Sequence, residues 1–541
     1  MEINMNKIWI NVFQQQDSGF SRWINMGYLK AALQTIPDVE VKINFYRLED
    51  VDIAILDALQ EKPTIIGLTV LQFNYYSVVK FAEKLKETLP QIHITLGNTF
   101  ASTYPVYLLE KYKSIDSIVI GEGEYSLVEL CERVLNGTSL KGCKGTYYRE
   151  GSEVHKNEKR VLRDNLDDYP MPDRSFCEYR ANIFGVLGSR GCYGNCTFCD
   201  INTLFKDMVR VRSINNILDE IEFLVKEWNA KYITFYDSTF CVNKIDAYNR
   251  LEELYYGLLR RNLHINFSIN LRSEQMDDRL MEIIQRLKSV GLDYLMFGFE
   301  AGNDEDLVFY GKPSNVKNHL NTLRLLRENK ILSEKYDISI SYGFINFHPY
   351  SKIENIKKNL LFLQESGLFV TFEILNTRFL NFGNGYISKK IEKDGLLLSP
   401  PEEPIVDPIG YKFVEHKIQT IYDITCELEN YFSGLKLQDA DEWISVYRRW
   451  SRFFPHKVNK YQNIFETYIE VRREISQLLI EIMWNVINDV EQNRQINSIL
   501  EHQKEILYEK MQQYKNDCEK FNIAYQKFNV DLYKINEALV R

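Results

Sequence analysis

The segment GSRGCYGNCTFCD, residues Gly188–Asp200, decides how the rest of the chain is interpreted. It overlaps the end of an apolar run expected to form a strand and places three cysteines within eight residues: Cys192, Cys196 and Cys199. Three thiolates on one loop cannot complete a tetrahedral zinc site without a fourth ligand, and the loop holds no histidine. They suit three irons of an iron–sulfur cluster, with the fourth iron left open. A zinc site with a distant fourth ligand, or chance clustering, is the alternative.

Around this loop, residues 181–395 show a repeated pattern of a strand followed by an amphipathic helix. Six strands are expected, at Phe184–Ser189, Tyr232–Tyr236, Ile265–Asn270, Tyr294–Gly298, Ile338–Ile345 and Phe369–Ile374. Six parallel units fall short of the eight that close a full barrel, so a partial (β/α)6 barrel is predicted. The cysteine loop follows the first of these strands, at the end of the barrel that carries active sites in such folds.

Residues 1–140 also alternate between strands and helices. Apolar runs occur at Lys7–Phe13, Thr64–Leu71, His93–Gly97 and Ser114–Gly121, with helical patterns between them. This alternation predicts a doubly wound, flavodoxin-like parallel sheet, in which ligands bind beyond the carboxyl ends of the strands.

The remaining segments are a connector and a helical region. Residues 141–180 have strand-like arms on either side of Glu150-Gly151, which predicts a β-hairpin with its turn at these two residues. A polar stretch with two prolines follows the hairpin, as in an extended linker. Residues 396–541 begin with the breaker PPEEPIVDP and continue in long helical patterns, which predict an all-helical domain. The whole chain is therefore expected to be an α/β protein with a helical C-terminal domain.

Composition excludes several classes of protein. The chain has 541 residues, a net charge of −9 and nine cysteines, too few and too scattered for a disulfide scaffold. It has no run of about 18 apolar residues, and its start, MEINMNKIWINVF, does not resemble a secretion signal. We therefore expect a cytoplasmic protein with no membrane partner. No basic, aromatic-interleaved tail is present, so nucleic acid is not an expected partner either.

The cysteine spacing, with Phe198 before the third cysteine, resembles the radical S-adenosylmethionine superfamily. The resemblance implies a [4Fe-4S] cluster on Cys192, Cys196 and Cys199, whose open iron chelates S-adenosylmethionine. Reduction by a donor such as flavodoxin or ferredoxin then yields a 5′-deoxyadenosyl radical, and the cofactors supply that chemistry. In place of the Gly-x-Pro-Gly-like turn that family members often have after the fifth strand, this chain has Asn346–Tyr350.

The same resemblance assigns roles to residues at the ends of later strands. Tyr236, Asp237 and Ser238 end the second strand, where Asp237 would face the methionine amino group as a carboxylate. Arg272 ends the third strand and would pair with the methionine carboxylate, and Glu300 after the fourth would suit the ribose hydroxyls. Each of these residues has an ordinary alternative role as an ion-pair partner at the barrel rim or as a helix cap.

The N-terminal region resembles the cobalamin-binding domain that precedes many of these enzymes. The matching pieces are GYLKAAL, GLTVL, TLGNTFAS and GEGEYSLVEL. The residues that the resemblance implies at the cobalamin site are Thr69, Gly97, Asn98, Gly121, Gly123 and Glu124. Thr69 would hydrogen-bond the dimethylbenzimidazole tail and Gly97 would leave room for it, although Asn98 stands where a second glycine is common.

One departure from that pattern concerns the cobalt. Many cobalamin proteins have a loop histidine that binds cobalt from below, but the loop QQQDSGFSRWINMG has none, and His93 is the only histidine of residues 1–140. We therefore expect cobalamin without a histidine axial ligand. Its lower face would be met by the segment Leu71–Asn74, in which Gln72 and Phe73 are the candidates. A degenerate domain that binds nothing is the alternative.

The two resemblances cover about residues 5–390 and together imply a cobalamin-dependent radical S-adenosylmethionine enzyme. The expected reaction is methyl transfer to an unactivated carbon of a small secondary-metabolite or peptide substrate, with one S-adenosylmethionine methylating cob(I)alamin and another giving the radical. A cyclase or ring-rearranging enzyme without methyl transfer is an alternative, which product mass separates. An iron–sulfur protein with a binding role only is the third, and it would not cleave S-adenosylmethionine.

Overall fold

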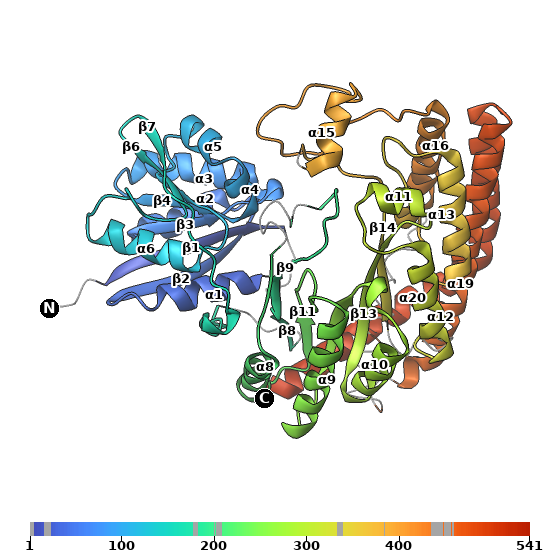
Figure 1. Ribbon diagram of the computed structural model, residues 1–541, viewed down its shortest axis with the longest axis horizontal. Coiled ribbons are helices and arrows are strands. Elements are labelled where there is room, and N and C mark those ends of the chain that lie inside the picture. The colour runs from blue at the N-terminus through green and yellow to red at the C-terminus, as the bar shows by residue number, and fades with distance from the viewer. Residues whose placement is uncertain are drawn as a thin grey trace.

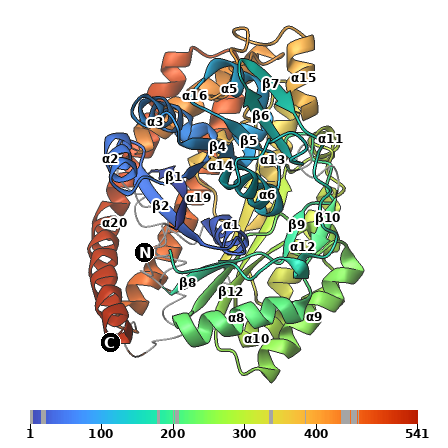
Figure 2. The same ribbon diagram turned by 90° about the vertical axis from the view of Figure 1, so that its left-hand side faces the viewer.

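The computed structural model arranges the chain in three regions, which Figure 1 shows side by side. An N-terminal sheet domain lies on the left, the strands of a second sheet lie in the centre, and long helices lie on the right. Figure 2 views the N-terminal domain from its outer side. The structure describes residues 5–15, 23–176, 182–199, 201, 208–332, 339–383, 385–433, 447, 456 and 459–540.

The N-terminal sheet has the described strand order β2-β1-β3-β4-β5-β6-β7. Strands β1 to β5 run parallel in the order 2-1-3-4-5, the flavodoxin-like arrangement, so the predicted doubly wound sheet is confirmed. The predicted hairpin exists as β6 and β7, but β6 pairs with β5 and so extends this sheet. The strands are β1 (Asn6–Gln14), β2 (Val39–Arg47), β3 (Ile65–Thr69), β4 (His93–Gly97), β5 (Ser117–Val119), β6 (Thr146–Glu150) and β7 (Glu153–Lys156).

Helices cover both faces of this sheet because successive side chains of each strand point to opposite faces. Trp9 and Phe13 of β1 pack into one core with α2 and α3, whereas Ile8 and Ile10 pack into another with α1 and α6. The helices of this domain are α1 (Ile24–Leu33), α2 (Val51–Glu61), α3 (Tyr75–Thr88), α4 (Asn98–Thr103), α5 (Pro105–Lys111) and α6 (Glu124–Leu135).

The central sheet contains five described parallel strands in the order β14-β13-β12-β11-β8. Beside it, β9 and β10 form a short antiparallel ribbon. The strands are β8 (Ile183–Val186), β9 (Ser189–Gly191), β10 (Val209–Val211), β11 (Tyr232–Phe235), β12 (Asn266–Leu271), β13 (Leu292–Glu300) and β14 (Ser339–Phe344). The helices that follow them are α8 (Ile214–Trp228), α9 (Lys244–Arg260), α10 (Asp278–Val290), α11 (Asp304–Phe309), α12 (Val316–Glu328) and α13 (Ile353–Ser366).

The sixth predicted strand, Phe369–Ile374, was wrong. Its second half belongs to a short helix, α14 (Phe372–Asn376), because the Thr371 hydroxyl caps that helix by accepting from the Ile374 amide at 3.2 Å. An isolated parallel bridge between Phe347 and Arg378 is what continues the edge of the sheet beyond β14. The fold is thus a partial barrel, but with five described strands rather than six.

The C-terminal region is helical, as predicted, and it packs on the barrel. Its main helices are α16 (His416–Ser433), α19 (Gln462–Glu491) and α20 (Ile496–Val540), and α15 (Gly385–Lys393) precedes them. One continuous apolar core extends from Phe184 of β8 to Phe528 of α20. The Val370 amide also donates to the Ser476 hydroxyl of α19 at 3.0 Å. Within the described residues, no helix combines the length and apolar character needed to cross a bilayer.

Candidate active site between the two sheets

The three cysteines lie on the loop that follows β9, and their thiols are partly exposed. A neighbouring segment holds this loop, because the Thr197 amide and hydroxyl donate to the carbonyl oxygens of Tyr310 and Phe309, both at 2.9 Å. The chain approaches closely on the other side as well. A Cβ on Gly311, which has a φ of +65°, would lie 2.6 Å from the Asn195 carbonyl oxygen. The loop is therefore fixed at the barrel mouth by residues that follow β13.

Two positively charged side chains lie near the sulfur atoms of the loop. Burial raises the pKa of the Cys196 thiol, while the charges of Lys312 and Arg272 oppose that rise. Arg272 also donates from Nη1 to the Cys192 Sγ at 3.7 Å. Among the described residues, no three Cys, His, Asp or Glu side chains converge closely enough for a single metal ion. Three thiolates on one loop can each bind a different iron, so this donor set fits an iron–sulfur cluster.

Arg272 and Glu300 come together around this loop. Arg272 follows β12, stacks on the Tyr193 ring at 4.8 Å and donates from Nε to Glu274 at 2.5 Å. Its Nη2 is buried and has no hydrogen-bond partner among the described residues. A buried guanidinium nitrogen without an acceptor suits a ligand carboxylate. Arg272, which the sequence analysis paired with the methionine carboxylate, thus has an N–H donor that no described residue uses.

Glu300 lies at the end of β13 in a strained conformation, with a φ of +67°. Burial raises the pKa of its carboxyl group, and Lys312, whose Nζ lies 3.7 Å from Oε1, opposes that rise. The neighbouring Gly298 and Gly343 leave space for this side chain, since a Cβ on Gly343 would lie 3.0 Å from Oε2. Backbone strain at a buried carboxyl group is typical of functional positions.

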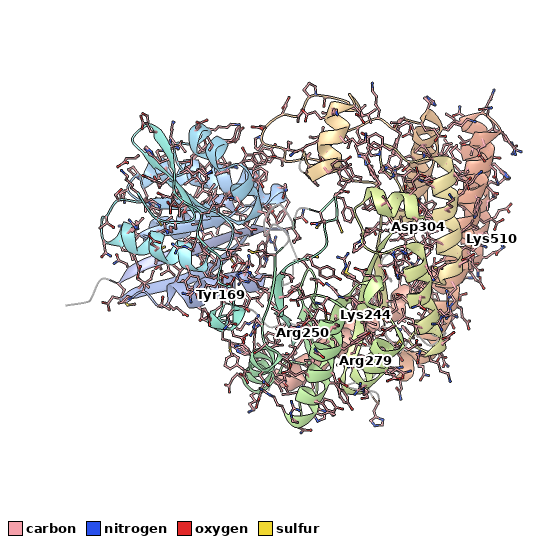
Figure 3. The ribbon with its side chains drawn as sticks, in the orientation of Figure 1. Tyr169, Lys244, Arg250, Arg279, Asp304 and Lys510 are labelled. Carbon is pink, nitrogen blue, oxygen red and sulfur yellow. The ribbon has the colours of Figure 1, made fainter. Side chains whose placement is uncertain are left out.

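The three site residues predicted after β11 are Tyr236, Asp237 and Ser238, and they have different surroundings. Tyr236 and Ser238 line the pocket described below. Asp237 is wholly buried instead, and neither of its oxygens accepts a hydrogen bond from a described residue. Burial raises the pKa of Asp237 to about 7, partly offset by Ser189 and by the charge of Arg250. Figure 3 labels Arg250, which belongs to α9 on the outside of the barrel.

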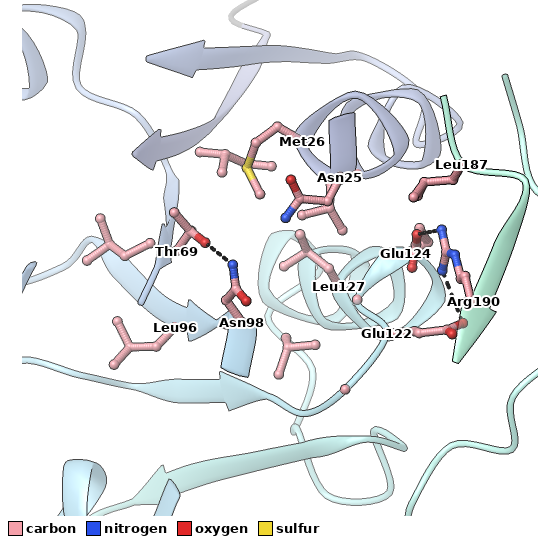
Figure 4. A pocket seen from close by; sticks show the side chains of 18 of the residues that line it. Asn25, Met26, Thr69, Leu96, Asn98, Glu122, Glu124, Leu127, Leu187 and Arg190 are labelled. Atoms are coloured by element: carbon pink, nitrogen blue, oxygen red, sulfur yellow. Dashed lines mark hydrogen bonds and ion pairs between the residues drawn. The ribbon is translucent and has the colours of Figure 1, made fainter. Parts of the chain in front are cut away.

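A pocket of about 290 Å³ lies between the N-terminal sheet and the strands that lead to the cysteine loop (Figure 4). The carboxyl ends of β3, β4 and β5 supply one wall, helices α1 and α6 supply another, and β9 closes the side toward the barrel. It is lined by every residue that the sequence placed at the cobalamin site except the Leu71 segment, namely Thr69, Gly97, Asn98, Gly121, Gly123 and Glu124.

The walls of this pocket fit the tail of a cobalamin. Gly97 and Gly121, the latter with a φ of +72°, both line this pocket, and a Cβ on either would meet nothing within 4 Å and would take up part of its open space. The buried Thr95 hydroxyl also lines the pocket and has no hydrogen-bond partner among the described residues. Asn98, with a φ of +79°, donates from its side chain to the Thr69 hydroxyl at 2.8 Å. Small residues and an unpaired hydroxyl thus form a cradle for a large ligand with polar groups.

The predicted lower-face segment does not line the pocket. Leu71 precedes the short helix η2 (Gln72–Asn74), and Phe73 is 45% exposed. His93 stands at the opposite end of β4 from Gly97, where it hydrogen-bonds the Ser117 hydroxyl at 2.8 Å and burial lowers its pKa to about 4. The neighbour of the cobalt therefore stays a prediction.

Four site residues escaped the sequence reasoning. Arg190 precedes the first cysteine by two positions, and Glu122 belongs to the GEGE motif, so both stood inside segments that were already singled out. Thr95 also stood inside such a segment, because it begins TLGNTFAS, whereas Lys312 carried no signal, since a lysine after a helix is common. Only the tertiary fold brings Lys312 to Glu300 and Thr95 to the pocket.

Comparison with known families agrees with this geometry. The family model described as the radical SAM superfamily, where SAM is S-adenosylmethionine, matches residues 186–363. The model described as the B12 binding domain matches residues 18–131. The first range contains the cysteine loop together with Arg272 and Glu300. The second contains most of the pocket wall that the N-terminal sheet supplies.

Individual relatives point in the same direction. An uncharacterized methyltransferase of Pyrococcus horikoshii is 25% identical over 340 residues, which span 59% of this chain and 70% of that protein. An anaerobic magnesium-protoporphyrin IX monomethyl ester cyclase of Rubrivivax gelatinosus is 26% identical over half of each chain. The fold resembles that of the cobalamin-dependent S-adenosylmethionine radical enzyme OxsB, whose structure has aqua-cobalamin bound. The TM-score is 0.70 at 19% sequence identity, and the match covers 97% of this chain and 81% of that one.

Proposed function

We infer that this chain, which belongs to the radical SAM superfamily and carries a B12-binding domain, is a methyltransferase that acts on an unactivated carbon. The observation that carries the inference is the position of the pocket. It is built from the small residues of the B12-binding domain and is closed by β9, the strand that leads directly into the three-cysteine loop. Sites for two cofactors therefore adjoin one another, as a reaction that needs both requires.

We assign residues to the cofactors on the basis of the sequence, and the geometry supports this assignment. Cys192, Cys196 and Cys199 would hold a [4Fe-4S] cluster, which would bind S-adenosylmethionine. Arg272 offers its unpaired nitrogen to the methionine carboxylate, and Glu300 accepts from the ribose hydroxyls. When bound, the cluster and S-adenosylmethionine supply a carbon-centred radical, and cobalamin supplies a methyl group.

The chain's own residues orient these groups and exclude water. Gly97 and Gly121 admit the cobalamin tail, while Thr69 and Thr95 hydrogen-bond it. We assign no histidine to the cobalt. Gln72 and Phe73 remain the proposed neighbours of its lower face, although they lie outside the pocket described above. The remaining proposed residues at this site are the pocket-lining Tyr236 and Ser238, and Asp237, which is proposed for the methionine amino group.

The substrate is proposed to be a small molecule or a peptide, and the electron donor a flavodoxin or ferredoxin. A second function is favoured by one specific observation, the similarity to a cyclase over half of the chain. In that alternative, the enzyme uses the same cofactors to close or rearrange a ring without transferring a methyl group. The pocket and the cysteine loop serve both reactions equally, so a product measurement must separate them.

The test incubates the anaerobic protein with cobalamin, S-adenosylmethionine and a strong reductant, and measures two products by mass spectrometry. A methyltransferase forms both 5′-deoxyadenosine and S-adenosylhomocysteine. The rearranging alternative forms 5′-deoxyadenosine alone, and a protein with a binding role only forms neither. Cys196→Ala should abolish 5′-deoxyadenosine formation. Cys518→Ala is the matched control, because that partly exposed thiol lies on α20, outside the loop.

A further inference from the structure

A buried group of charged side chains joins the proposed cobalamin pocket to the strand that leads into the cysteine loop. Arg190 lies in the middle of β9, two residues before Cys192. Its guanidinium group crosses to the N-terminal domain and binds two carboxylates there. Nη1 lies 3.1 Å from Glu122 Oε2, and Nη2 lies 2.6 Å from Glu124 Oε1 (Figure 4).

The group is enclosed and its charges are balanced. The side chains of Arg190, Glu122 and Glu124 are only 12%, 9% and 6% exposed. A second arginine, Arg210, stands opposite Arg190 in the β9–β10 ribbon and also pairs with Glu122. Two arginines therefore face two glutamates in a dry environment, where such pairs are strong and where removing one partner leaves an uncompensated charge.

Aromatic rings fix the Arg190 guanidinium group from its faces. The rings of Tyr169 and Tyr28 lie 4.5 and 5.1 Å from it, and the Tyr169 hydroxyl donates to Glu122 at 2.6 Å. Figure 3 labels Tyr169 at the border between the N-terminal domain and the barrel. A lysine could not replace this arrangement, because only the planar guanidinium group can donate to two carboxylates and stack on rings at once.

Arg190 thus belongs to both proposed cofactor sites. Together with Glu122 and Glu124 it lines the pocket, where Glu122 of the loop after β5 and Glu124, the first residue of α6, flank Gly123. Along its own chain, Arg190 leads directly to Cys192. A displacement of its side chain would therefore shift the pocket wall relative to the cysteine loop.

We propose that Arg190 is a positioning residue that fixes the cobalamin pocket at one separation and orientation from the cluster loop. This inference rests on the proposed function, because it presupposes that both cofactors bind. Glu122 and Glu124 are its partners in this role.

A second contact between the same regions makes the proposal testable without loss of the fold. Arg212 donates from Nη1 to the Tyr28 hydroxyl of α1 at 3.2 Å and pairs with Glu220 of α8 at 2.6 Å. This contact uses the Tyr28 hydroxyl, whereas Arg190 lies over the Tyr28 ring, so the two regions keep an attachment through Arg212 when the Arg190 side chain is shortened. We therefore expect Arg190→Gln to fold with the domains still docked, but with a variable separation between the two sites.

The experiment loads full-length wild type, Arg190→Gln and Arg190→Lys anaerobically with iron, sulfide and cobalamin. Cob(II)alamin and the reduced cluster are both paramagnetic, so the electron-spin relaxation of cob(II)alamin reports the separation of the two groups. Arg286→Gln is the matched control, since it breaks the Arg286–Glu252 pair between α10 and α9 on the same barrel. Iron content and cobalamin affinity are measured on each protein.

In the wild type and in Arg286→Gln, we expect the cob(II)alamin electron spin to relax at a single fast rate, because the reduced cluster lies at one fixed separation from it. Arg190→Gln should keep its iron, bind cobalamin at least tenfold more weakly, and show a relaxation rate that is slower by at least twofold or spread over a range. Arg190→Lys should lie between them. If Arg190→Gln is too unstable to load, Glu124→Gln, which keeps the shape of the side chain, is compared in its place.

Three results are distinguishable from the expected one. An Arg190→Gln protein with wild-type relaxation and affinity overturns the inference. Loss of iron from both Arg190→Gln and Glu124→Gln also overturns it, because the charged group would then maintain the loop itself rather than its alignment with the pocket. A wild-type protein that binds no cobalamin or no iron refutes the proposed function and not this inference alone.

Discussion

Asp237→Asn is expected to stabilise the cofactor-free protein, and increasingly so as the pH rises. The Asp237 carboxyl group is fully buried, and neither oxygen accepts a hydrogen bond from a described residue. Burial raises its pKa from an ordinary 3.8 to about 7, against the smaller opposing influence of Ser189 and Arg250. Asparagine has nearly the same shape and cannot ionise.

The magnitude follows from the pKa difference of about three units. Each unit corresponds to about 1.4 kcal/mol, so the ionised group destabilises the fold by up to about 4 kcal/mol. A raised carboxyl pKa has no effect below about pH 4, reduces stability progressively between about pH 4 and 7, and has its full effect above that range. The advantage of Asp237→Asn should therefore grow from about 1–2 kcal/mol at pH 5 to about 4 kcal/mol at pH 8.

Thermal unfolding of cofactor-free wild type and Asp237→Asn at several pH values between 5 and 8 measures this difference. For a folding unit of about 200 residues, 4 kcal/mol corresponds to roughly 10 °C in the midpoint. Asp219→Asn is the control, because its carboxylate is exposed and pairs with Arg261 on the surface. If Asp237→Asn were less stable than the wild type at pH 8, other groups would have to stabilise the buried carboxylate. The inference that its ionisation destabilises the fold would then be wrong.

Three further predictions concern the proposed cofactor sites. Thr95→Val should weaken cobalamin binding by about five- to tenfold in equilibrium dialysis, because it removes an unpaired hydroxyl from the pocket wall. The control is Thr322→Val at a buried threonine of the barrel, which should leave the cobalamin affinity unchanged. Gly97→Val should abolish cobalamin binding, because the new side chain would extend into the pocket. The thermal midpoint should stay within a few degrees of the wild type, since any residue can adopt the Gly97 φ of −152°. Retained binding would show that the ligand lies elsewhere. Glu300→Gln should raise the dissociation constant of S-adenosylmethionine about tenfold in calorimetry, because a charged acceptor becomes a neutral one; an unchanged constant would remove Glu300 from that site.

The parts of the fold that the sequence revealed are those encoded locally. The apolar runs of β1, β3 and β4 and the cysteine spacing each lie within a dozen residues, and the doubly wound parallel arrangement follows from the alternation with helices. Strand β2 was missed although Val39, Val41 and Ile43 alternate, because much of this edge strand is exposed and its pattern is weak. The strand expected at Phe369–Ile374 fails for a local reason as well, the Thr371 cap.

The candidate site was less accessible to prediction wherever it depends on contacts between distant segments. Arg190 of β9 and Glu124 at the start of α6 are 66 residues apart in sequence, so no pattern in either segment predicts their pairing. The same holds for Lys312 beside Glu300, whose contact depends on the chain turning back after β13. The pocket-lining residues, in contrast, were predictable, because the carboxyl ends of parallel strands meet at one edge of a sheet.

The most direct test of the account is the metal content of the protein purified without oxygen in the presence of cobalamin. The account predicts about four irons and about one cobalt per chain, with an absorption spectrum that shows both a cluster and a corrinoid. Iron without cobalt would contradict the assignment of the pocket and the methyltransferase proposal. Zinc without iron would contradict the radical mechanism altogether.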